Sequence, residues 1–220
     1  MPRVARGLVD GFIYHILNRG NGGQQVFHKD QDYRVFTDLM DEAKGRYSMN
    51  IFAYCLLPNH FHIVVMPLRA EELSKWMQWL MTSHVRRYHR HYGTSGHVWQ
   101  GRFKSFPIQE DAHLLTVLRY VEGNPLRAGL ASSAREWPWS SHKERIGEKF
   151  RLLIDEIPVE LPKDWGGYVD SPFIKRELVI LRESVNRQSP YGTLTWQMKV
   201  GRELGLECTL RARGRPRKRI

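Results

Sequence analysis

Apolar residues recur with two different periods along the first half of the chain, and each period indicates the element that the segment forms. Short, nearly continuous apolar runs bounded by turn residues predict strands, at 11–18, 51–57 and 60–66. Apolar positions spaced by three and four residues predict helices, at 30–47, 71–92 and 110–124. A further strand or hairpin is expected at 97–106.

The predicted order is strand, helix, strand, strand, helix, strand, helix. Its first six elements match an α+β fold, the ferredoxin-like βαββαβ sandwich with an antiparallel sheet, and an extra helix follows. Only Pro58 and Asn59 separate the second and third strands, so these two should be antiparallel neighbours. Less regular patterns predict three parts: a sandwich at 1–145, a linker with short helices at 146–189, and a helical appendage with a basic tail at 190–220.

Two histidines open the third predicted strand. Because side chains of a strand alternate between its faces, His60 and His62 share one face while Phe61 and Ile63 point to the other. Two neighbouring imidazoles on a rigid strand can bind one divalent cation. The alternative is that both are partly buried histidines with local hydrogen bonds.

The composition points to a negatively charged partner. The 220 residues carry a net charge of +11, which favours binding to nucleic acid or to an anionic membrane surface. No stretch has the length of a membrane span, so a membrane-embedded protein is not expected. Only Cys55 and Cys208 occur, which argues against a disulfide framework and favours a cytoplasmic location.

Basic residues gather in three places that we expect to contact DNA. The end of the second predicted helix carries Arg86, Arg87 and Arg90. Cations there suit the helix dipole, but Tyr88 and Tyr92 lie among them and bases could stack on these rings. Both interpretations stay open. Further along the chain, Arg102 and Lys104 share one face of the predicted fourth strand, and Arg127 follows the third helix.

The third basic group is the C-terminal tail, which has no acidic residue over 211–219. Its basic residues are Arg211, Arg213, Arg215, Arg217 and Lys218 among others. The Gly-Arg-Pro at 214–216 resembles the AT-hook, a segment that lies in a narrow minor groove. The alternative is a non-specific tail that binds phosphates through counterion release.

One tyrosine of the third predicted helix stands apart from its apolar stripe. At ~100° per residue, Tyr120 lies about 110° from the centre of that stripe, on a side face rather than in the deep core. Asn124 is four residues further and falls close to the same side. Taken alone, Tyr120 is typical of a half-exposed helix tyrosine.

Four blocks in this order resemble the IS200-type single-tyrosine transposases and, more closely, the REP-associated tyrosine transposases. They are Leu57-Pro58-Asn59-His60-Phe61-His62, Trp99-Gln100-Gly101-Arg102-Phe103, Tyr120-Val121-Glu122-Gly123-Asn124-Pro125-Leu126-Arg127-Ala128-Gly129-Leu130 and Trp137-Pro138-Trp139-Ser140-Ser141. The resemblance covers residues 10–145, and the C-terminal end also resembles the tail of many such proteins.

The resemblance implies a role for each residue at the matching positions. By this resemblance His60 and His62 would be the paired metal-binding histidines, Tyr120 would be the nucleophile, and Asn124 would take the place of the family's polar residue at or near the metal. The family cuts single-stranded DNA beside a hairpin and joins the 5′ phosphate to tyrosine. A tyrosine hydroxyl is a weak nucleophile, so a cation that polarises the phosphate suits this chemistry. Mg²⁺ or Mn²⁺ fits mixed nitrogen and oxygen ligands.

Two functions therefore follow from the sequence. The first is a metal-dependent endonuclease and strand transferase, a DNA nicking and joining enzyme that acts on single-stranded or hairpin DNA beside hairpin-forming repeats. The second is a non-catalytic protein that keeps the fold and binds DNA or RNA hairpins. Both a monomer and a homodimer are compatible with the sequence, and in a homodimer Tyr120 could serve the partner's histidines.

Overall fold

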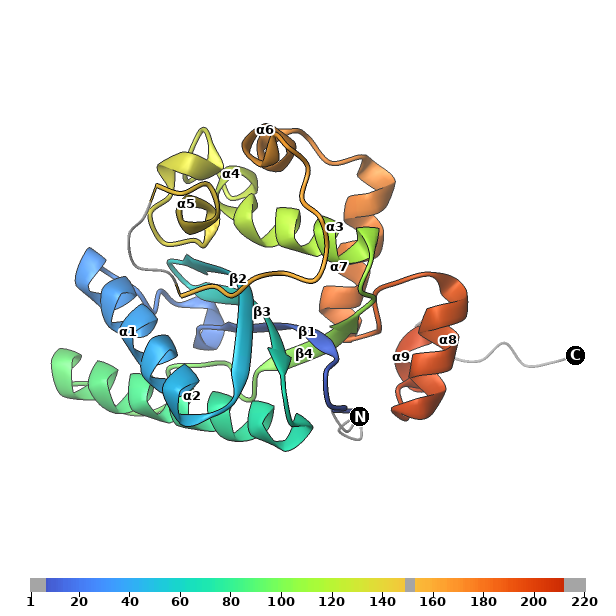
Figure 1. Cartoon of the computed structure of the whole chain (residues 1–220). Helices are drawn as coiled ribbons and strands as arrows, with labels where there is room; N and C mark the ends of the chain where they lie inside the picture. Colours follow the sequence, from blue (N-terminus) through green and yellow to red (C-terminus); the bar gives the residue numbers. More distant parts are fainter. Residues whose placement is uncertain (1–6, 149–152, 212–220) are drawn as a thin grey trace, which may run out of the picture.

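A four-stranded antiparallel sheet forms the centre of the computed structural model, which describes residues 7–148 and 153–211 (Figure 1). The strands are β1 (Ile13–Arg19), β2 (Met49–Leu57), β3 (His60–Pro67) and β4 (Lys104–Ile108). Their spatial order is β2-β3-β1-β4, and every neighbouring pair is antiparallel. This order inserts β3 between β1 and β2, as a ferredoxin-like sandwich requires, so the fold class predicted from the sequence is confirmed.

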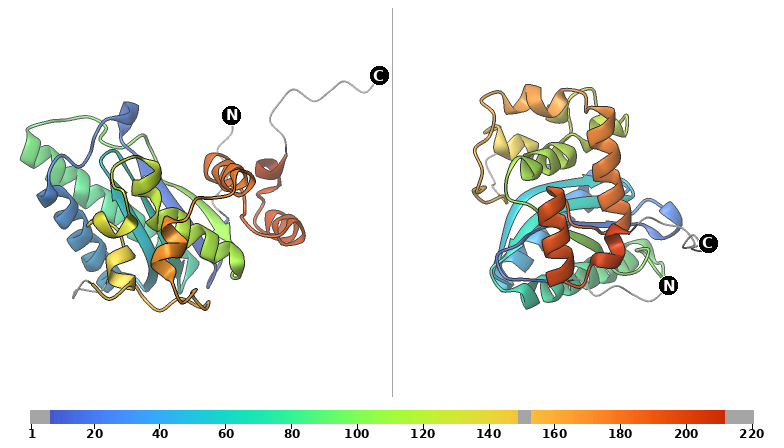
Figure 2. Two further views of the ribbon diagram at one scale, coloured as in Figure 1. Left: turned by 90° about the horizontal axis from the view of Figure 1, so that it is seen from above. Right: turned by 90° about the vertical axis from the view of Figure 1, so that its right-hand side faces the viewer.

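Helices cover both faces of this sheet (Figure 1; Figure 2). They are α1 (Asp30–Arg46), α2 (Ala70–Tyr92), α3 (Ala112–Glu122), α4 (Asn124–Arg127), α5 (His142–Arg145), α6 (Trp165–Asp170), α7 (Lys175–Arg187), α8 (Leu194–Glu203) and α9 (Glu207–Leu210), with 3₁₀ turns at Asn21–Gly23 and Ala134–Glu136. The helices α1 and α2 pack on one face, α3 to α7 lie on the other, and α8 and α9 lie at one side of the molecule.

Alternation along β3 divides the interior into two cores. Phe61, Ile63 and Val65 point toward α1 and α2, where they join a fully buried cluster with Phe36 and Trp76. Val64 points to the other face, which α3 covers. The face assignment made from the period-two pattern is therefore confirmed, and it leaves His62 on the α3 side of the sheet.

The segment that follows α5 completes the second core. Trp165 and Val169 of α6 and Leu181 of α7 are buried against the same side of the sheet as α3. Two adjacent glycines at 166–167 disfavour a helix here, yet α6 forms. Its N-cap is Asp164, whose carboxylate accepts a hydrogen bond from the Gly167 amide at 2.9 Å. The three-part division at 145 and 189 stays a prediction.

The predicted strand at 97–106 is wrong over most of its length. Only residues from Lys104 onward join the sheet, as β4. The preceding residues instead cross the end of β1, where Trp99 forms an isolated bridge with Gly20 and the Gln100 amide donates to the Arg19 carbonyl oxygen at 2.8 Å. Tertiary hydrogen bonds thus replace a regular ladder, and Arg102 lies outside any strand.

Among the described residues, no helix combines the length and the apolar character that crossing a membrane requires. Both cysteines are free thiols, Cys55 buried and Cys208 exposed.

Candidate active site

Residues from five elements and two loops line a cavity of about 690 Å³ at one end of the central strands. Five of them were predicted from the sequence: His60, His62, Tyr120, Arg102 and Lys104. The sequence did not indicate the others, among which are Arg19, Asn59, Gln100, Val185 and Asn186. The fold therefore brings the histidine pair, the tyrosine and two cations to one place.

Asn59 sets the orientation of the His60 ring. Its side-chain nitrogen donates to the Gly23 carbonyl oxygen at 3.1 Å, which leaves its side-chain oxygen to accept from His60 Nδ1 at 2.6 Å. His60 Nδ1 therefore carries the hydrogen, and the Nε2 lone pair is free to bind a cation. Burial, helped by the positive charge of Arg19, lowers the pKa of His60 to about 4, so this ring is neutral at neutral pH.

His62 contacts a histidine that no pattern in the sequence indicated. His15 lies fully buried on β1, and its Nε2 atom is 2.9 Å from Nδ1 of His62. When His62 Nδ1 is the donor in this bond, its Nε2 lone pair is free as well. Burial lowers the pKa of His15 to about 3. The pKa of His62 lies well below its usual value, mainly because the ring is buried and also because His15 and His60 lie beside it. No local pattern marks His15, because its partner is 47 residues away.

The two imidazoles fit a divalent cation, although the described residues offer no third strong ligand. No group of three or more histidine, cysteine, aspartate or glutamate side chains gathers around a possible ion in the parts of the chain that the structure describes. Mg²⁺ commonly keeps several waters and shares substrate phosphates, so two protein ligands are compatible with Mg²⁺ or Mn²⁺ when the DNA supplies phosphate oxygens.

Asn124 is not among the residues that line the cavity. The α3 helix ends at Glu122, and Gly123, with φ −84° and ψ 9°, separates it from α4, which begins at Asn124. A Cβ on Gly123 would lie 3.1 Å from the Arg119 carbonyl oxygen and 3.2 Å from that of Val169, so close packing against α6 favours glycine there. The side-chain nitrogen of Asn124, Nδ2, is buried without a hydrogen-bond partner.

Tyr120 is buried more deeply than its helical position predicted. Only 8 % of it is exposed, because later segments cover the side face on which the period places it. The Arg127 guanidinium lies 4.3 Å from the ring centroid and donates to the Tyr120 carbonyl oxygen, and Phe173 meets the ring edge-on. On the cavity side, the ring stands perpendicular to His62 at a centroid distance of 5.8 Å.

Other tyrosines are poorly placed to act with the histidines. Tyr14 is fully buried, and burial raises the pKa of its hydroxyl, which accepts from the Val9 amide, to about 12. Tyr88 and Tyr92 line a separate crevice, where the Tyr92 hydroxyl donates to Asp32 at 2.6 Å. Within the described ranges, Tyr120 is the one tyrosine that lines the histidine cavity.

The predicted DNA-binding residues divide by exposure. Exposed side chains belong to Arg86, Arg90, Arg102, Lys104 and Arg211, whereas Arg87 is half-buried. Arg127 is also half-buried against Tyr120, and this burial lowers the pKa of its guanidinium to about 10. Four tail residues lie outside the described residues, namely Arg213, Arg215, Arg217 and Lys218. The cations of the cavity rim are thus the best placed for a phosphate near Tyr120.

A second buried cluster holds the end of α3 in place. Glu122 is fully buried, and its carboxylate accepts hydrogen bonds at 2.7–3.0 Å from Ser141, His142, Arg145 and Trp165. Burial alone would raise the pKa of Glu122, but the Arg145 charge and these hydrogen bonds outweigh it and hold the pKa at about 2. Ser141 belongs to the Trp137–Ser141 block, whose structural role is thereby explained in part.

Known proteins resemble this chain in sequence and in fold. The model of the IS200-like transposase family matches residues 8–124. A Haemophilus influenzae protein named as a REP-associated tyrosine transposase is 26% identical over 161 residues, which are 64% of this chain and 85% of that protein. The solved structure of a REP-associated tyrosine transposase bound to a REP hairpin has a TM-score of 0.57 and 18% identity, over 80% of this chain and 100% of that one. A Deinococcus radiodurans transposase structure aligns at a TM-score of 0.39 and 16% identity, over 56% of this chain and 96% of that one.

Proposed function

The chain belongs to the IS200-like transposase family, and on that premise we propose that it is a metal-dependent single-strand DNA endonuclease and strand transferase that uses Tyr120. One observation carries the proposal. The cavity places Tyr120 beside His60 and His62, whose rings are neutral and whose Nδ1 atoms already have partners. With His62 Nδ1 as the donor to His15, two free Nε2 atoms beside a tyrosine make a site for polarising and attacking a phosphate.

The reaction exchanges one phosphodiester for another. The Tyr120 hydroxyl oxygen attacks the scissile phosphorus and its proton passes to solvent. The bond to the upstream 3′ oxygen breaks, and this oxygen takes up a proton and leaves as a 3′-hydroxyl. The downstream strand stays attached to Tyr120 through its 5′ phosphate. A second 3′-hydroxyl reverses the step and releases Tyr120, so rejoining requires no external energy source.

The residues around Tyr120 position the strand and the ring. Arg102 and Lys104 line the cavity with exposed side chains and can hold phosphates on either side of the reacting one. Arg127 packs over the ring and limits its movement. A divalent ion on His60 and His62, when bound, stabilises the negative charge that develops on the phosphate oxygens.

The substrate we propose is single-stranded DNA beside a hairpin. A solved relative of the same fold is bound to a REP hairpin. The net charge of +11 on this chain favours a polyanionic partner such as DNA. Transposition or rearrangement of hairpin-bearing repeats would be the outcome of cutting and joining at such sites.

Covalent capture tests this proposal directly. Wild-type protein mixed with Mn²⁺ and a labelled hairpin oligonucleotide with single-stranded flanks should give a protein–DNA band that resists heat and denaturant. Peptide mapping should place the adduct at Tyr120. The Tyr120→Phe variant should give no band, because it keeps the ring and removes only the attacking oxygen.

The matched control is Tyr88→Phe, which removes a hydroxyl that contacts His28 outside the cavity. It should form the band like wild type. A band that persists in Tyr120→Phe would assign the chemistry to another nucleophile. No band from the wild type, despite tight hairpin binding, would favour the non-catalytic hairpin-binding protein.

A further inference from the structure

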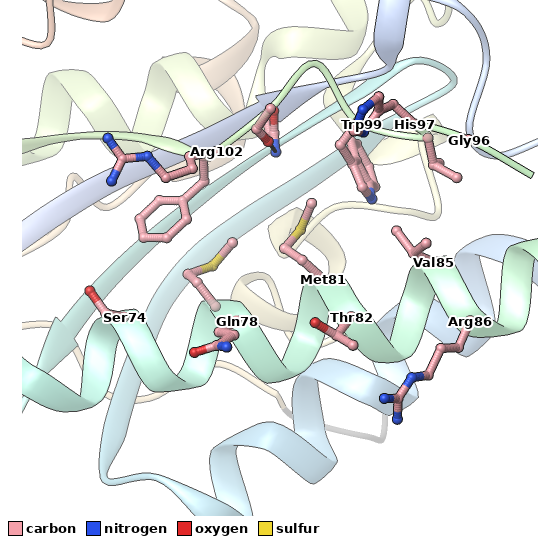
Figure 3. Close-up of a pocket in the computed structure, with 15 residues that line it drawn as sticks. Ser74, Gln78, Met81, Thr82, Val85, Arg86, Gly96, His97, Trp99 and Arg102 are labelled. Carbon is pink, nitrogen blue, oxygen red and sulfur yellow. Dashed lines mark hydrogen bonds between the residues drawn. The ribbon is translucent and has the colours of Figure 1, made fainter. Parts of the chain in front are cut away.

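A second pocket of about 620 Å³ lies next to the histidine cavity, between α2 and the segment 96–103 (Figure 3). Its α2 side carries an apolar row, Met77, Met81 and Val85, beside a row of short polar side chains, Ser74, Gln78 and Thr82. Figure 3 shows Trp99 facing α2 from the opposite wall. The volume lies within the ~300–1,000 Å³ of small-molecule sites.

Trp99 presents an unused hydrogen-bond donor at this pocket. Only 5% of the residue is exposed, and its indole packs edge-on against Phe61 at a centroid distance of 5.3 Å. Its Nε1 atom has no hydrogen-bond partner. A buried N–H without an acceptor costs free energy that an acceptor on a ligand would recover. The pocket thus offers apolar walls for a flat ring and a donor for the edge of that ring.

The pocket adjoins the proposed active site. Asn18 and Arg102 line both cavities, and Asn18 fixes the wall between them because its side-chain nitrogen donates to the Gly101 carbonyl oxygen at 3.1 Å. Arg102 and Arg86 stand at opposite ends of the pocket, with the Arg86 guanidinium directed outward (Figure 3). A strand whose phosphate lies at Tyr120 therefore meets a cation where it enters this pocket and another where it leaves.

We propose that this pocket, which we call the base pocket, holds one unpaired nucleobase from the single-stranded flank of the bound DNA. The proposal rests on the proposed function for the identity of its ligand. Unpaired bases are bound by stacking on apolar and aromatic surfaces and by hydrogen bonds to their edges, and the base pocket supplies both. The partly exposed thioether side chain of Met81 adapts to flat rings of different outline. The base pocket then sets which nucleotide lies a fixed distance from the cut.

The test fills the base pocket without touching the core. Thr82 is exposed on α2 and lines the pocket, so Thr82→Trp should fold normally and occupy the space of the base. Affinity is measured in EDTA for a labelled hairpin with single-stranded flanks and for the same hairpin without flanks. Thr82→Trp should bind the flanked hairpin about tenfold more weakly than wild type and the blunt hairpin equally well.

An abasic scan of the flanks identifies the nucleotide. One abasic position should weaken wild-type binding by about tenfold, and the same DNA should bind Thr82→Trp with no further loss, because both changes remove the same interaction. Trp99→Phe, which keeps a ring and removes the N–H, should show part of the same loss at the same position. The control is Thr195→Trp, an exposed threonine on α8 away from the pocket, which should bind all probes like wild type.

The outcomes separate this inference from the proposed function. Binding in EDTA requires no cleavage. The affinities of Thr82→Trp for intact and abasic DNA can therefore be compared even if Tyr120 forms no adduct. If Thr82→Trp binds every flanked probe as tightly as wild type does, the inference is overturned, even when Tyr120 forms its adduct. That result would leave an apolar peptide as the better occupant of the base pocket.

Discussion

Two buried polar clusters contact α3, and they differ in how many of their hydrogen-bonding groups are paired. Around Glu122, both carboxylate oxygens accept two hydrogen bonds each and a guanidinium balances the charge. Around Tyr120, the histidine rings use one nitrogen each, His15 Nδ1 has no partner, and the cluster opens into a cavity.

The difference separates a structural cluster from a reactive one. A saturated buried network stabilises one conformation, whereas removing one of its members leaves a buried charge unpaired. An unsaturated cluster at a cavity costs stability and keeps its lone pairs available for a ligand. Changes in the Glu122 cluster should therefore act on folding, and changes in the histidine cavity should act on chemistry.

The largest effect is expected at the histidine pair. His60→Ala and His62→Ala should each lower the rate of DNA cleavage at least about 100-fold, because the charge on the phosphate loses its stabilisation. Hairpin affinity in a gel-shift assay should change little, since the basic surface remains. EDTA should reproduce the loss in wild type, and Mn²⁺ should reverse it. Full cleavage in EDTA would contradict the metal assignment.

Glu122→Gln should destabilise the fold by roughly 3–5 kcal/mol, because it leaves the buried Arg145 guanidinium without its counter-charge. Urea denaturation measures this loss. The matched control is Glu71→Gln, whose pair with Lys75 is exposed and contributes about 0–1 kcal/mol. Equal midpoints for the two variants would mean that the Glu122 cluster does not hold α3.

Acid should weaken the fold through the same carboxylate. The pKa of Glu122 is depressed from 4.5 to about 2, so its stabilisation is complete above pH 4.5 and is lost as the pH falls toward 2. In that window wild-type stability should fall by up to about 1.4 kcal/mol per pH unit from this group. Glu122→Gln should not show this loss of stability between pH 4.5 and 2. If the stabilities of wild type and Glu122→Gln fall in parallel over that range, Glu122 is not the group that titrates.

His15→Phe should weaken Mn²⁺ binding by about 10–100-fold, as loss of a group that orients a metal-binding histidine typically does. The substitution keeps a ring in the buried position beside Phe106. Titration calorimetry measures the affinity. His84→Phe is the control, because His84 is also buried but packs against Phe27 and Trp99, away from the cavity. Unchanged Mn²⁺ affinity in His15→Phe would remove His15 from the site.

The smallest effect concerns the tail. Deleting residues 211–220 should reduce the slope of log affinity against log salt by about 0.7–0.9 for each phosphate that the tail binds in the full-length protein. Cleavage of a short substrate at saturating DNA should persist, because the residues that line the histidine cavity all precede the tail. A deletion with an unchanged slope would show that the tail binds no phosphate.

Local patterns in the sequence determined the elements of this protein and several of its site residues. Periods of two and 3.6 residues are properties of single segments, so the strands β1 to β3, the helices α1 to α3 and the shared face of His60 and His62 were predictable. The order of the elements was sufficient to predict the ferredoxin-like sheet, since few topologies connect them with short loops.

Which distant residues meet depends on how the elements pack in three dimensions. The antiparallel pairing of β1 with β3 brings His15 to His62, and no single-segment period contains that register. Tyr120 is buried by Arg127 and Phe173, and the base pocket forms because tertiary hydrogen bonds hold Trp99 opposite α2. Such contacts depend on how separate elements pack, which the sequence of each element does not specify alone.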